Sequence, residues 1–546
     1  MVYLLDAMER AGKEPGTITF LSPVGDERLT WGDLHADALR AAGGLQAAGA
    51  GPGRSVALLS LNSRAAVTAI AAVWLAGASL TVLPTPARTM DIEAFLAATE
   101  RHLDRLGQPV VLVGSPFEDL SSALASAGHQ VRPLDSVLAE APAGLWRRPA
   151  LVDDDPAILQ LTSGTTSEPR IVRVSHANLA ANLQGLAEAI DHGAKHGRTL
   201  SWLPLSHDMG LIGILAAMLT CGQCDLLLAS PTDYLANPAS WLQLAAEHQV
   251  QTIVGPTSAY ALAARFLPYG PRLDLSTITG AMSGGEQIDP DAIETFLTAA
   301  APHGLDPRTF LPGYGLAEAT FAVTVPTPMR GLRVDEVDAD TLAREGRAAP
   351  PRPGEPTRRL PLLGSPIART SLRIVGPAGR QQLPDRTVGE VEVRGPAVTS
   401  GYHDAEPMDE GMEESLADGW LRTGDLGYLV DGELVLCGRK KDLIIVGGRN
   451  IYPEDVERAA GQTPGVRAGN AVAFPVPRPG GLGEGVAVAV ESRVPDPDAV
   501  RRAVTDRVRT TIGIQPVAVY VLPAGSIPKT PSGKLQRAEA ARRFTS

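Results

Sequence analysis

Along most of the chain, hydrophobic positions alternate between helical spacing and short unbroken apolar runs. Helical spacing predicts amphipathic helices, and short apolar runs bounded by turn residues predict buried strands. Helices that alternate with buried strands are typical of layered sheets, so we expect an α/β fold. The helices are expected at residues 34–45, 237–249 and 289–301, and the strands at residues 55–60, 110–113, 224–229 and 252–254.

The pattern changes in the last third of the chain. Stretches of alternating polar and apolar residues at 371–375, 389–394 and 432–437 are each bounded by turns, and they predict an antiparallel β subdomain over about 371–437. The preceding segment, 326–361, is rich in Pro, Arg and Asp with weak periodicity, and we interpret it as an irregular surface insertion.

A domain plan follows from these changes of pattern. We expect a large N-terminal domain of layered α/β subdomains plus the β subdomain over residues 1–437, and a hinge at the charged tetrapeptide 438–441. Residues 442–546 are expected to form a small, mobile α+β C-terminal domain.

One uncharged run, residues 65–83, is long enough to raise the question of a membrane span. It is rich in Ala and followed by Pro84, which suits a buried helix, a cap at Gly77 and a short strand. The N-terminus places Asp6 and Glu9 where a signal peptide needs an uninterrupted apolar core. We therefore expect no membrane span and a cytoplasmic location.

Composition and charge narrow the class of partner. The chain of 546 residues is 44% hydrophobic and 20% charged, as in ordinary globular proteins. Its net charge of −12 argues against nucleic acid as a partner. Residues 442–546 nevertheless carry 14 basic and 10 acidic side chains, so this lobe is compatible with an acidic docking partner.

The three cysteines are few and odd in number, which suits a reducing compartment. Cys221 and Cys224 form a lone C-x-x-C, and Cys437 stands apart. A zinc ribbon would need a second pair, and a redox motif would need a thioredoxin-like context, so we favour buried structural thiols.

The chemistry centres on a loop crowded with hydroxyl groups. An apolar run at 157–161 predicts a strand, a second run at 171–174 predicts another, and Ser175 is a candidate cap for the helix that follows. Backbone N–H and hydroxyl donors around a glycine suit a polyphosphate, although the Gly-Lys pair of a nucleotide P-loop is absent. An ordinary Ser/Thr-rich turn is the alternative for the loop alone. The loop residues are Thr162, Ser163, Gly164, Thr165, Thr166 and Ser167.

Further motifs stand in order after this loop. They are Ser201-Trp-Leu-Pro-Leu-Ser-His-Asp-Met-Gly210, Ser283-Gly-Gly-Glu286, Gly313-Tyr-Gly-Leu-Ala-Glu318, Arg422-Thr-Gly-Asp425, and the pair Gly438-Arg-Lys-Lys-Asp442 with Pro528-Lys-Thr-Pro-Ser-Gly-Lys534. Together with the loop, they resemble the adenylate-forming superfamily of acyl-CoA synthetases, peptide-synthetase adenylation domains and luciferases. The resemblance covers roughly residues 15–540. The stretches 207–213 and 314–320 are most similar to those of the fatty acyl-AMP ligases.

The resemblance implies an ATP-dependent activation of a carboxylic acid, with Mg²⁺ as metal cofactor. Tyr314 is implied to stack on adenine, Asp425 to accept the ribose hydroxyls with Arg439 nearby, and Glu318 with Thr162 to hold the metal. Asp425 is expected in a tight turn at residues 423–425, and Glu318 at the start of a helix. Each of the three residues also has a structural alternative, as a turn-capping tyrosine, an Asx-turn aspartate or a helix-start glutamate. The implied nucleotide-binding positions are Thr162, Ser163, Gly164, Thr165, Thr166, Gly284, Gly285, Glu286, Gly313, Tyr314, Gly315, Asp425, Arg439 and Lys534.

The implied catalytic residues are Lys534, Glu318 and His207. A carboxylic acid with a pKa of about 4 is already ionised at neutral pH, so charge repulsion between substrate carboxylate and phosphate is the obstacle. An ammonium placed between the two anions removes it. Lys441 maps onto the hinge position, where rotation would withdraw Lys534 and admit a phosphopantetheine thiol. A frayed tail and a solvated basic turn are the alternatives for these two lysines.

The phosphate loop departs from the family pattern T-S-G-[ST]-T-G-x-P-K-G. Ser167 replaces a glycine, Arg170 a lysine and Ile171 a second glycine. Arg170 keeps the positive charge, and Ser167 in a glycine conformation costs about 1 kcal/mol. We expect slower or differently gated adenylation rather than none.

Four functions remain open on these grounds. The favoured one is a fatty acyl-AMP ligase that loads an acyl carrier protein, and the alternative with the same half-reaction is an acyl-CoA ligase. The positions after His207-Asp-Met are apolar, which favours an unsubstituted acyl chain over an amino-bearing acid. The fourth hypothesis, a non-catalytic scaffold protein, is supported only by the altered phosphate loop.

Overall fold

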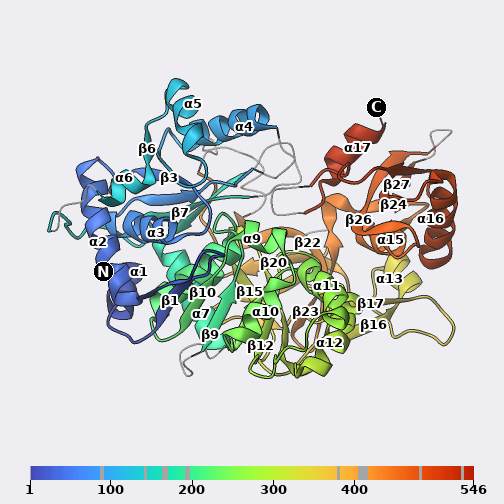
Figure 1. The fold of residues 1–546 in the computed structure, drawn as a ribbon. Coiled ribbons are helices and arrows are strands. Elements are labelled where there is room, and N and C mark those ends of the chain that lie inside the picture. The colour runs from blue at the N-terminus through green and yellow to red at the C-terminus, as the bar shows by residue number, and fades with distance from the viewer. Residues whose placement is uncertain are drawn as a thin grey trace.

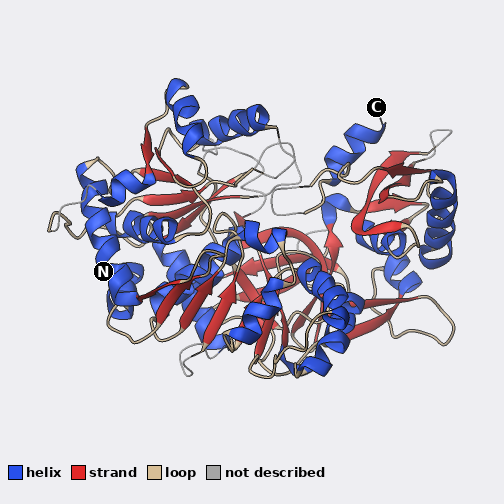
Figure 2. Ribbon diagram, in the orientation of Figure 1, coloured by secondary structure: helices blue, strands red, loops and turns tan. Residues whose placement is uncertain are grey.

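The computed structural model describes residues 2–86, 91–139, 144–162, 170–190, 197–377, 381–403, 416–478, 483–529 and 534–545. Helices flank central sheets in the large body of the protein, and the last hundred residues form a lobe beside it that carries the C-terminus (Figures 1 and 2). This arrangement confirms the expected α/β fold with a large N-terminal part and a small C-terminal one. Within the described chain, no helix combines the length and the apolar composition needed to cross a membrane.

The first sheet has six strands in the order β6-β5-β3-β4-β7-β8, and all neighbours are parallel except β7 and β8. The uncharged run at 65–83 forms a buried helix, a left-handed cap at Gly77 with φ 86° and a strand, as predicted. The elements of this layer are α2 (Trp31–Ala47), β3 (Ser55–Leu59), α3 (Arg64–Ala76), β4 (Ser79–Val82), α4 (Ile92–Arg105), β5 (Val110–Val113), α5 (Ser121–Ser126), β6 (Val131–Pro133), α6 (Leu134–Ala139), β7 (Pro156–Leu161) and β8 (Ile171–Ser175).

The second sheet has seven strands in the order β13-β12-β11-β9-β10-β1-β2, parallel except for the edge pair β1 and β2. The Ser175 hydroxyl accepts the Asn178 N–H at 3.1 Å, which confirms the predicted cap of α7. The elements are α1 (Tyr3–Ala11), β1 (Thr17–Phe20), β2 (Glu27–Thr30), α7 (His176–Ile190), β9 (Arg198–Ser201), β10 (Asp225–Leu228), α9 (Pro231–Ala236), α10 (Ser240–Glu247), β11 (Thr252–Val254), α11 (Thr257–Phe266), β12 (Gly280–Ser283), α12 (Pro290–Ala300) and β13 (Phe310–Pro312).

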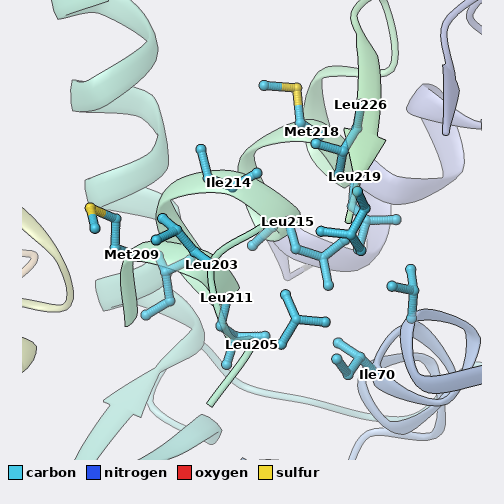
Figure 3. Packing of buried hydrophobic residues seen from close by; sticks show 14 of the residues in the cluster. Ile70, Leu203, Leu205, Met209, Leu211, Ile214, Leu215, Met218, Leu219 and Leu226 are labelled. Carbon is cyan, nitrogen blue, oxygen red and sulfur yellow. The ribbon is translucent and has the colours of Figure 1, made fainter. Parts of the chain in front are cut away.

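A wide π-helix, η2 (Met209–Ala216), continues into α8 (Ala217–Cys221) and runs through the core between the two sheets. Its apolar side chains pack with Ile70 of α3 and Leu226 of β10 (Figure 3). Burial of these side chains stabilises the folded protein by roughly 25 cal/mol for each Å² of apolar surface removed from water. The residues just before η2, His207 and Asp208, are thereby anchored on a rigid element at the edge of the core.

The β subdomain is antiparallel, as predicted, with strand order β19-β20-β22-β21 and β23 paired to β22. The expectation that Thr423-Gly-Asp425 forms a tight turn is wrong. These residues lie inside one long strand, where the register with β20 shifts, because a bulge lets the chain bend without leaving the sheet. The strands are β19 (Ser371–Val375), β20 (Gly389–Arg394), β21 (Leu416–Ala417), β22 (Trp420–Val430) and β23 (Glu433–Arg439).

The segment 326–361 is not irregular, contrary to the prediction. Strands β16 (Val334–Asp338) and β17 (Thr357–Pro361) pair antiparallel, and α13 (Ala339–Glu345) follows β16. The periodicity is weak because β17 buries Arg358, a charged residue whose partners come from outside the segment. A three-stranded sheet, β14 (Tyr314–Gly315), β15 (Ala322–Val325) and β18 (Ser365–Pro366), leads into this segment and away from it.

The C-terminal lobe has its own apolar core around Val456, Val488 and Val504. Strands β26 and β27 pair antiparallel, and β27 and β28 pair parallel. The elements are β24 (Ile444–Val446), β25 (Arg449–Ile451), α15 (Pro453–Gly461), β26 (Val466–Pro477), β27 (Glu484–Ser492), α16 (Pro497–Ile512), β28 (Ala518–Leu522) and α17 (Arg537–Thr545).

Candidate active site

A cleft of about 2550 Å³ lies between the two sheets, the β subdomain and the C-terminal lobe. Every described residue that the sequence marks as a site residue lines it: Thr162, His207, Gly284, Gly285, Glu286, Gly313, Tyr314, Gly315, Glu318, Asp425, Arg439, Lys441 and Lys534. The remaining predicted positions, Ser163, Gly164, Thr165 and Thr166, lie outside the described residues, as does Ser167.

Tyr314, Asp425 and Arg439 form one linked group on the cleft wall. The Tyr314 hydroxyl donates to Asp425 Oδ2 at 2.6 Å, and Arg439 Nε lies 3.1 Å from Asp425 Oδ1. Asp425 and Arg439 are opposite each other across β22 and β23. Burial raises the pKa of Tyr314 well above its usual value, so the phenol remains a hydrogen-bond donor. The group therefore presents an oriented carboxylate beside an aromatic ring.

Lys534 meets His207 across the cleft. Its Nζ lies 3.4 Å from His207 Nε2, and the other ring nitrogen of His207 lies 2.7 Å from Asp208 Oδ1. Burial lowers the pKa of the Lys534 amine, while the carboxylates of Asp208 and Glu286 oppose this shift. A lysine of the C-terminal lobe is thus held in the cleft by the His207 imidazole, which is itself paired with Asp208 of the main body.

Glu318 lies in a single 3₁₀ turn, Ala317–Ala319, where the sequence indicated a longer helix. Its Oε1 accepts the hydroxyl of Tyr402 at 3.1 Å, and that hydroxyl also accepts from Arg170 at 3.2 Å. The Arg170 guanidinium lies 4.9 Å from the centre of the Tyr402 ring. Sequence reasoning missed Tyr402, since it belongs to no motif and reaches the site only through its pairing with β8 at Val172.

The two ends of the hydroxyl-rich loop are tied together at the cleft. Thr162 N–H donates to the Arg170 carbonyl at 2.9 Å, and Arg170 N–H donates to Thr162 Oγ1 at 3.1 Å. These two bonds join the end of β7 to the start of β8, and the Arg170 side chain contacts Tyr402 beside them.

Two residues that line the cleft, Glu286 and Gly315, are tightly held by neighbouring backbone. Glu286 Oε1 accepts the Ser258 N–H at 2.8 Å, and burial raises the pKa of this carboxyl. A Cβ on Gly315 would lie 1.8 Å from the Phe321 carbonyl oxygen, so only glycine fits there. Ser258 was not expected from the sequence, because nothing in its local pattern differs from an ordinary helix start.

The segment after Arg439 is a 3₁₀ turn, Lys440–Asp442, held at both ends by ion pairs. Lys440 Nζ lies 3.1 Å from Glu390 of the β subdomain, and Asp442 lies 2.6 Å from Arg537 of α17. Burial lowers the pKa of Lys441, which lies between them. The turn therefore links the main body to the lobe through charged contacts on both sides.

The segment 326–361 reaches across to the C-terminal lobe. Arg358 Nε lies 2.8 Å from Asp455, and the guanidinium lies 4.1 Å from the centre of the Tyr452 ring. Arg449 of β25 lies 2.7 Å from Asp340 of α13. A buried arginine and an outer ion pair thus connect the segment to the lobe in the arrangement that places Lys534 in the cleft.

Part of the cleft wall is apolar. Several of the lining side chains are aliphatic or aromatic, and they come from η2, α9, α11 and segments near them. A wall of this kind accommodates a hydrocarbon chain and excludes water from it. The residues are Trp202, Met209, Ile214, Tyr234, Leu262, Met282, Leu316 and Phe321.

Comparison with known proteins agrees with this geometry. The AMP-binding enzyme family matches residues 8–403. The chain is 40% identical over 522 residues to the putative ligase Rv1013 of Mycobacterium tuberculosis, covering 94% of each chain. It is 34% identical over 579 residues to the long-chain-fatty-acid–AMP ligase FadD26 of Mycobacterium marinum, covering 98% of this chain and 96% of that protein. A structure from studies of the fatty acyl-adenylate ligases of E. coli and L. pneumophila superposes with a TM-score of 0.90 at 30% identity, over 99% of this chain and 97% of that chain.

Proposed function

This chain belongs to the AMP-binding enzymes and is an adenylate-forming ligase for carboxylic acids, and we propose that it activates a fatty acid and transfers the acyl group to an acyl carrier protein. The contact that carries the proposal is the one between Lys534 and His207, 3.4 Å apart. It places an ammonium of the lobe inside the cleft that also holds the Tyr314–Asp425 group.

In the first half-reaction, an oxygen of the substrate carboxylate forms a bond to the α-phosphorus of ATP, and the bond from that phosphorus to pyrophosphate breaks. Lys534 donates hydrogen bonds to both anions and offsets the repulsion between them. His207 and Asp208 hold the amine in position. No general base is needed, because the carboxylate is ionised at neutral pH.

Nucleotide binding is proposed to use the linked group on the cleft wall. The ring of Tyr314 would stack on adenine, and Asp425 would accept the ribose hydroxyls. Each carboxylate oxygen has two lone pairs. Asp425 can therefore accept hydrogen bonds from the ribose hydroxyls while keeping Tyr314 and Arg439 as partners. The backbone at Gly284 and Gly285 would pass beside the base.

Magnesium is proposed to bind at Glu318 and Thr162, both of which line the cleft. In the described part of the chain, no group of three or more His, Cys, Asp or Glu side chains could hold a metal ion. A single carboxylate fits Mg²⁺, which binds one or two protein carboxylates and completes its shell with phosphate oxygens and water. The ion would neutralise charge on the phosphates, and Tyr402 would orient Glu318 through its hydroxyl.

In the second half-reaction, a thiolate attacks the acyl carbonyl and AMP leaves. We propose that rotation at Lys441 withdraws Lys534 and opens the path for a phosphopantetheine arm. The contacts of Arg358 and Asp340 with the lobe favour the arrangement seen here. A carrier protein can offset their loss through docking energy, whereas free CoA makes no such contacts. The carrier is therefore favoured over CoA as acceptor.

Function can be tested with purified enzyme, ATP, Mg²⁺ and saturated fatty acids of graded length. We expect ATP–pyrophosphate exchange with fatty acids and intact-mass loading of an acyl carrier protein. Absence of exchange with every carboxylic acid contradicts the proposed adenylation step. Rapid acylation of free CoA contradicts only the proposal that the acceptor is a carrier protein.

Weakening the contact between α13 and the lobe should increase acylation of free CoA. Asp340→Lys replaces the ion pair with Arg449 by a like-charge contact. A loss of about 1 kcal/mol in the stability of the arrangement seen here corresponds to a roughly 5-fold increase in the rate of CoA acylation. The measurement is the rate of acyl-CoA formation from presynthesised acyl-AMP. Glu355→Lys makes the same charge change on the exposed tip of the segment and should leave the rate unaltered. Equal rates in both variants contradict the proposed restraint.

Filling the apolar part of the cleft should shorten the preferred substrate. A Cβ on Gly213 would lie 2.5 Å from the Phe321 ring, so Gly213→Leu forces the ring or the new side chain into the cleft. Exchange with long-chain acids should fall about 10- to 100-fold relative to short-chain acids. Gly213→Ala with Phe321→Leu restores the space and should recover long chains. An equal loss at all lengths would place the acyl chain elsewhere.

A further inference from the structure

Two cysteines lie in contact at a place that the ligase reaction does not use. Cys221 ends α8 and Cys224 comes directly before β10, and their sulfur atoms are 3.7 Å apart. Both are thiols in this structure, and neither lines the active-site cleft. The sequence alone favoured buried structural thiols for this C-x-x-C. Their contact and surroundings give them different chemical characters.

The pair is asymmetric in exposure. Cys221 is half-buried and reachable from solvent, while Cys224 is 2% exposed. The neighbouring Cys224 thiol and the backbone N–H groups of Gln223 and Cys224 lower the pKa of Cys221. The contact with Cys221 and burial raise the pKa of Cys224. An accessible thiol that ionises more readily, in contact with a buried one that ionises less readily, is the arrangement of an attacking and a resolving cysteine.

The turn between the two cysteines is held by contacts on both sides. The Trp31 indole N–H donates to the Cys224 carbonyl at 3.0 Å, and the Gly16 N–H donates to the Gly222 carbonyl at 3.0 Å. These bonds attach the turn to α2 and to the start of β1, so the sulfur atoms stay close while the chain is folded. Cys437 makes a natural comparison, since it is 0% exposed and burial raises its pKa to about 12.

We propose that Cys221 and Cys224 are a reversible thiol–disulfide site that reacts with the disulfide of a small thiol such as glutathione. The Cys221 thiolate attacks one sulfur of that disulfide, forms a mixed disulfide and releases one small thiolate. Cys224 then loses its proton and attacks the Cys221 sulfur, releasing the second small thiol. The two protein thiols are oxidised to one disulfide, and the small disulfide is reduced to two thiols. This site is independent of the proposed acyl transfer.

The test uses the full chain, reduced and then exposed to glutathione disulfide. Alkylation of the remaining thiols and peptide mass spectrometry should find a Cys221–Cys224 disulfide in the wild type, with Cys437 still a thiol. Cys224→Ser should retain glutathione on Cys221, because the resolving thiol is gone, and Cys224→Ala serves if the serine variant does not fold. Cys221→Ser should acquire glutathione at Cys224 at least ~10-fold more slowly. ATP–pyrophosphate exchange by Cys221→Ser reports that the protein is folded.

Three results would overturn the proposal. The first is a wild-type protein in which both thiols remain alkylatable after exposure to glutathione disulfide. The second is a mixed disulfide on Cys221 that persists in the wild type, since Cys224 would then not resolve it. The third is modification of Cys437 as fast as Cys221, which would mean that the pair has no special reactivity.

Discussion

Lys534→Ala is expected to reduce acyl-adenylate formation by about 10²- to 10³-fold while leaving transfer from presynthesised acyl-AMP nearly intact. The amine is held in the cleft, 3.4 Å from His207, and we propose that it touches both reacting anions only in the first half-reaction. Its removal restores the repulsion between carboxylate and α-phosphate. ATP–pyrophosphate exchange measures the first step, and loading of a carrier protein from acyl-AMP measures the second.

The neighbouring Lys529 supplies a matched control. It belongs to the same segment of the lobe, but its amine donates to the Gly469 carbonyl and to Asn470 Oδ1 within the lobe itself. Lys529→Ala should therefore keep exchange within a few-fold of the wild type. If Lys534→Ala slows both half-reactions equally, the lysine is structural and the adenylation proposal loses its principal catalytic group. A scaffold without catalytic function would show no change in either step.

Asp425→Ala is expected to reduce kcat/KM for ATP by about 100-fold, which corresponds to about 3 kcal/mol. Asp425 is 5% exposed and joins the Tyr314 hydroxyl to the Arg439 guanidinium, so its loss removes the proposed ribose acceptor and leaves two donors without their partner. The free energy of unfolding should also fall by about 1 kcal/mol, because the partly buried Tyr314 hydroxyl loses its acceptor. ATP titration and chemical denaturation measure the two effects separately.

Two milder variants separate the carboxylate from its neighbours. Asp425→Asn keeps the shape and one acceptor oxygen but loses the charge, so it should fall between wild type and the alanine variant. Tyr314→Phe keeps the ring and removes only the hydroxyl, so ATP affinity should change about 3-fold or less. A folded Asp425→Ala protein with unaltered ATP affinity would contradict the assignment of Asp425 to the ribose. A large loss of ATP affinity in Tyr314→Phe would mean that the hydroxyl, rather than the ring, provides the main contact.

Local pattern was sufficient where one segment decides its own structure. The helix Arg64–Ala76, the Gly77 cap and the strand Ser79–Val82 follow from spacing and one glycine, and the structure confirms them. Local pattern failed where partners lie elsewhere. The segment 326–361 lacked periodicity because Arg358 is buried against Asp455 and Tyr452 of the lobe, and a lone arginine in a strand gives no apolar signal.

The candidate site shows the same division. Ordered motifs identified Tyr314, Asp425 and Lys534, and their roles in catalysis stay predictions. Tyr402 could not be found, because its hydrogen bond to Glu318 joins residues 84 positions apart and depends on a β-bridge between Tyr402 and Val172. Asp208 lies inside one of these motifs, but its contact with His207, and the contact of His207 with Lys534 of the lobe, are visible only in the structure.

By itself, the sequence determined the class of fold, local elements such as α3 and β4, and the residue types available for binding an acid, a nucleotide and a metal. These properties depend on short-range spacing and on side-chain chemistry, and both can be read directly from the order of the amino acids. Only the tertiary structure decided which charges meet. Lys534 and His207 are 327 positions apart, and their contact arises because the lobe packs against the main body through Arg358 and Asp340. Such packing is a sum of many weak long-range contacts, and no single segment encodes it.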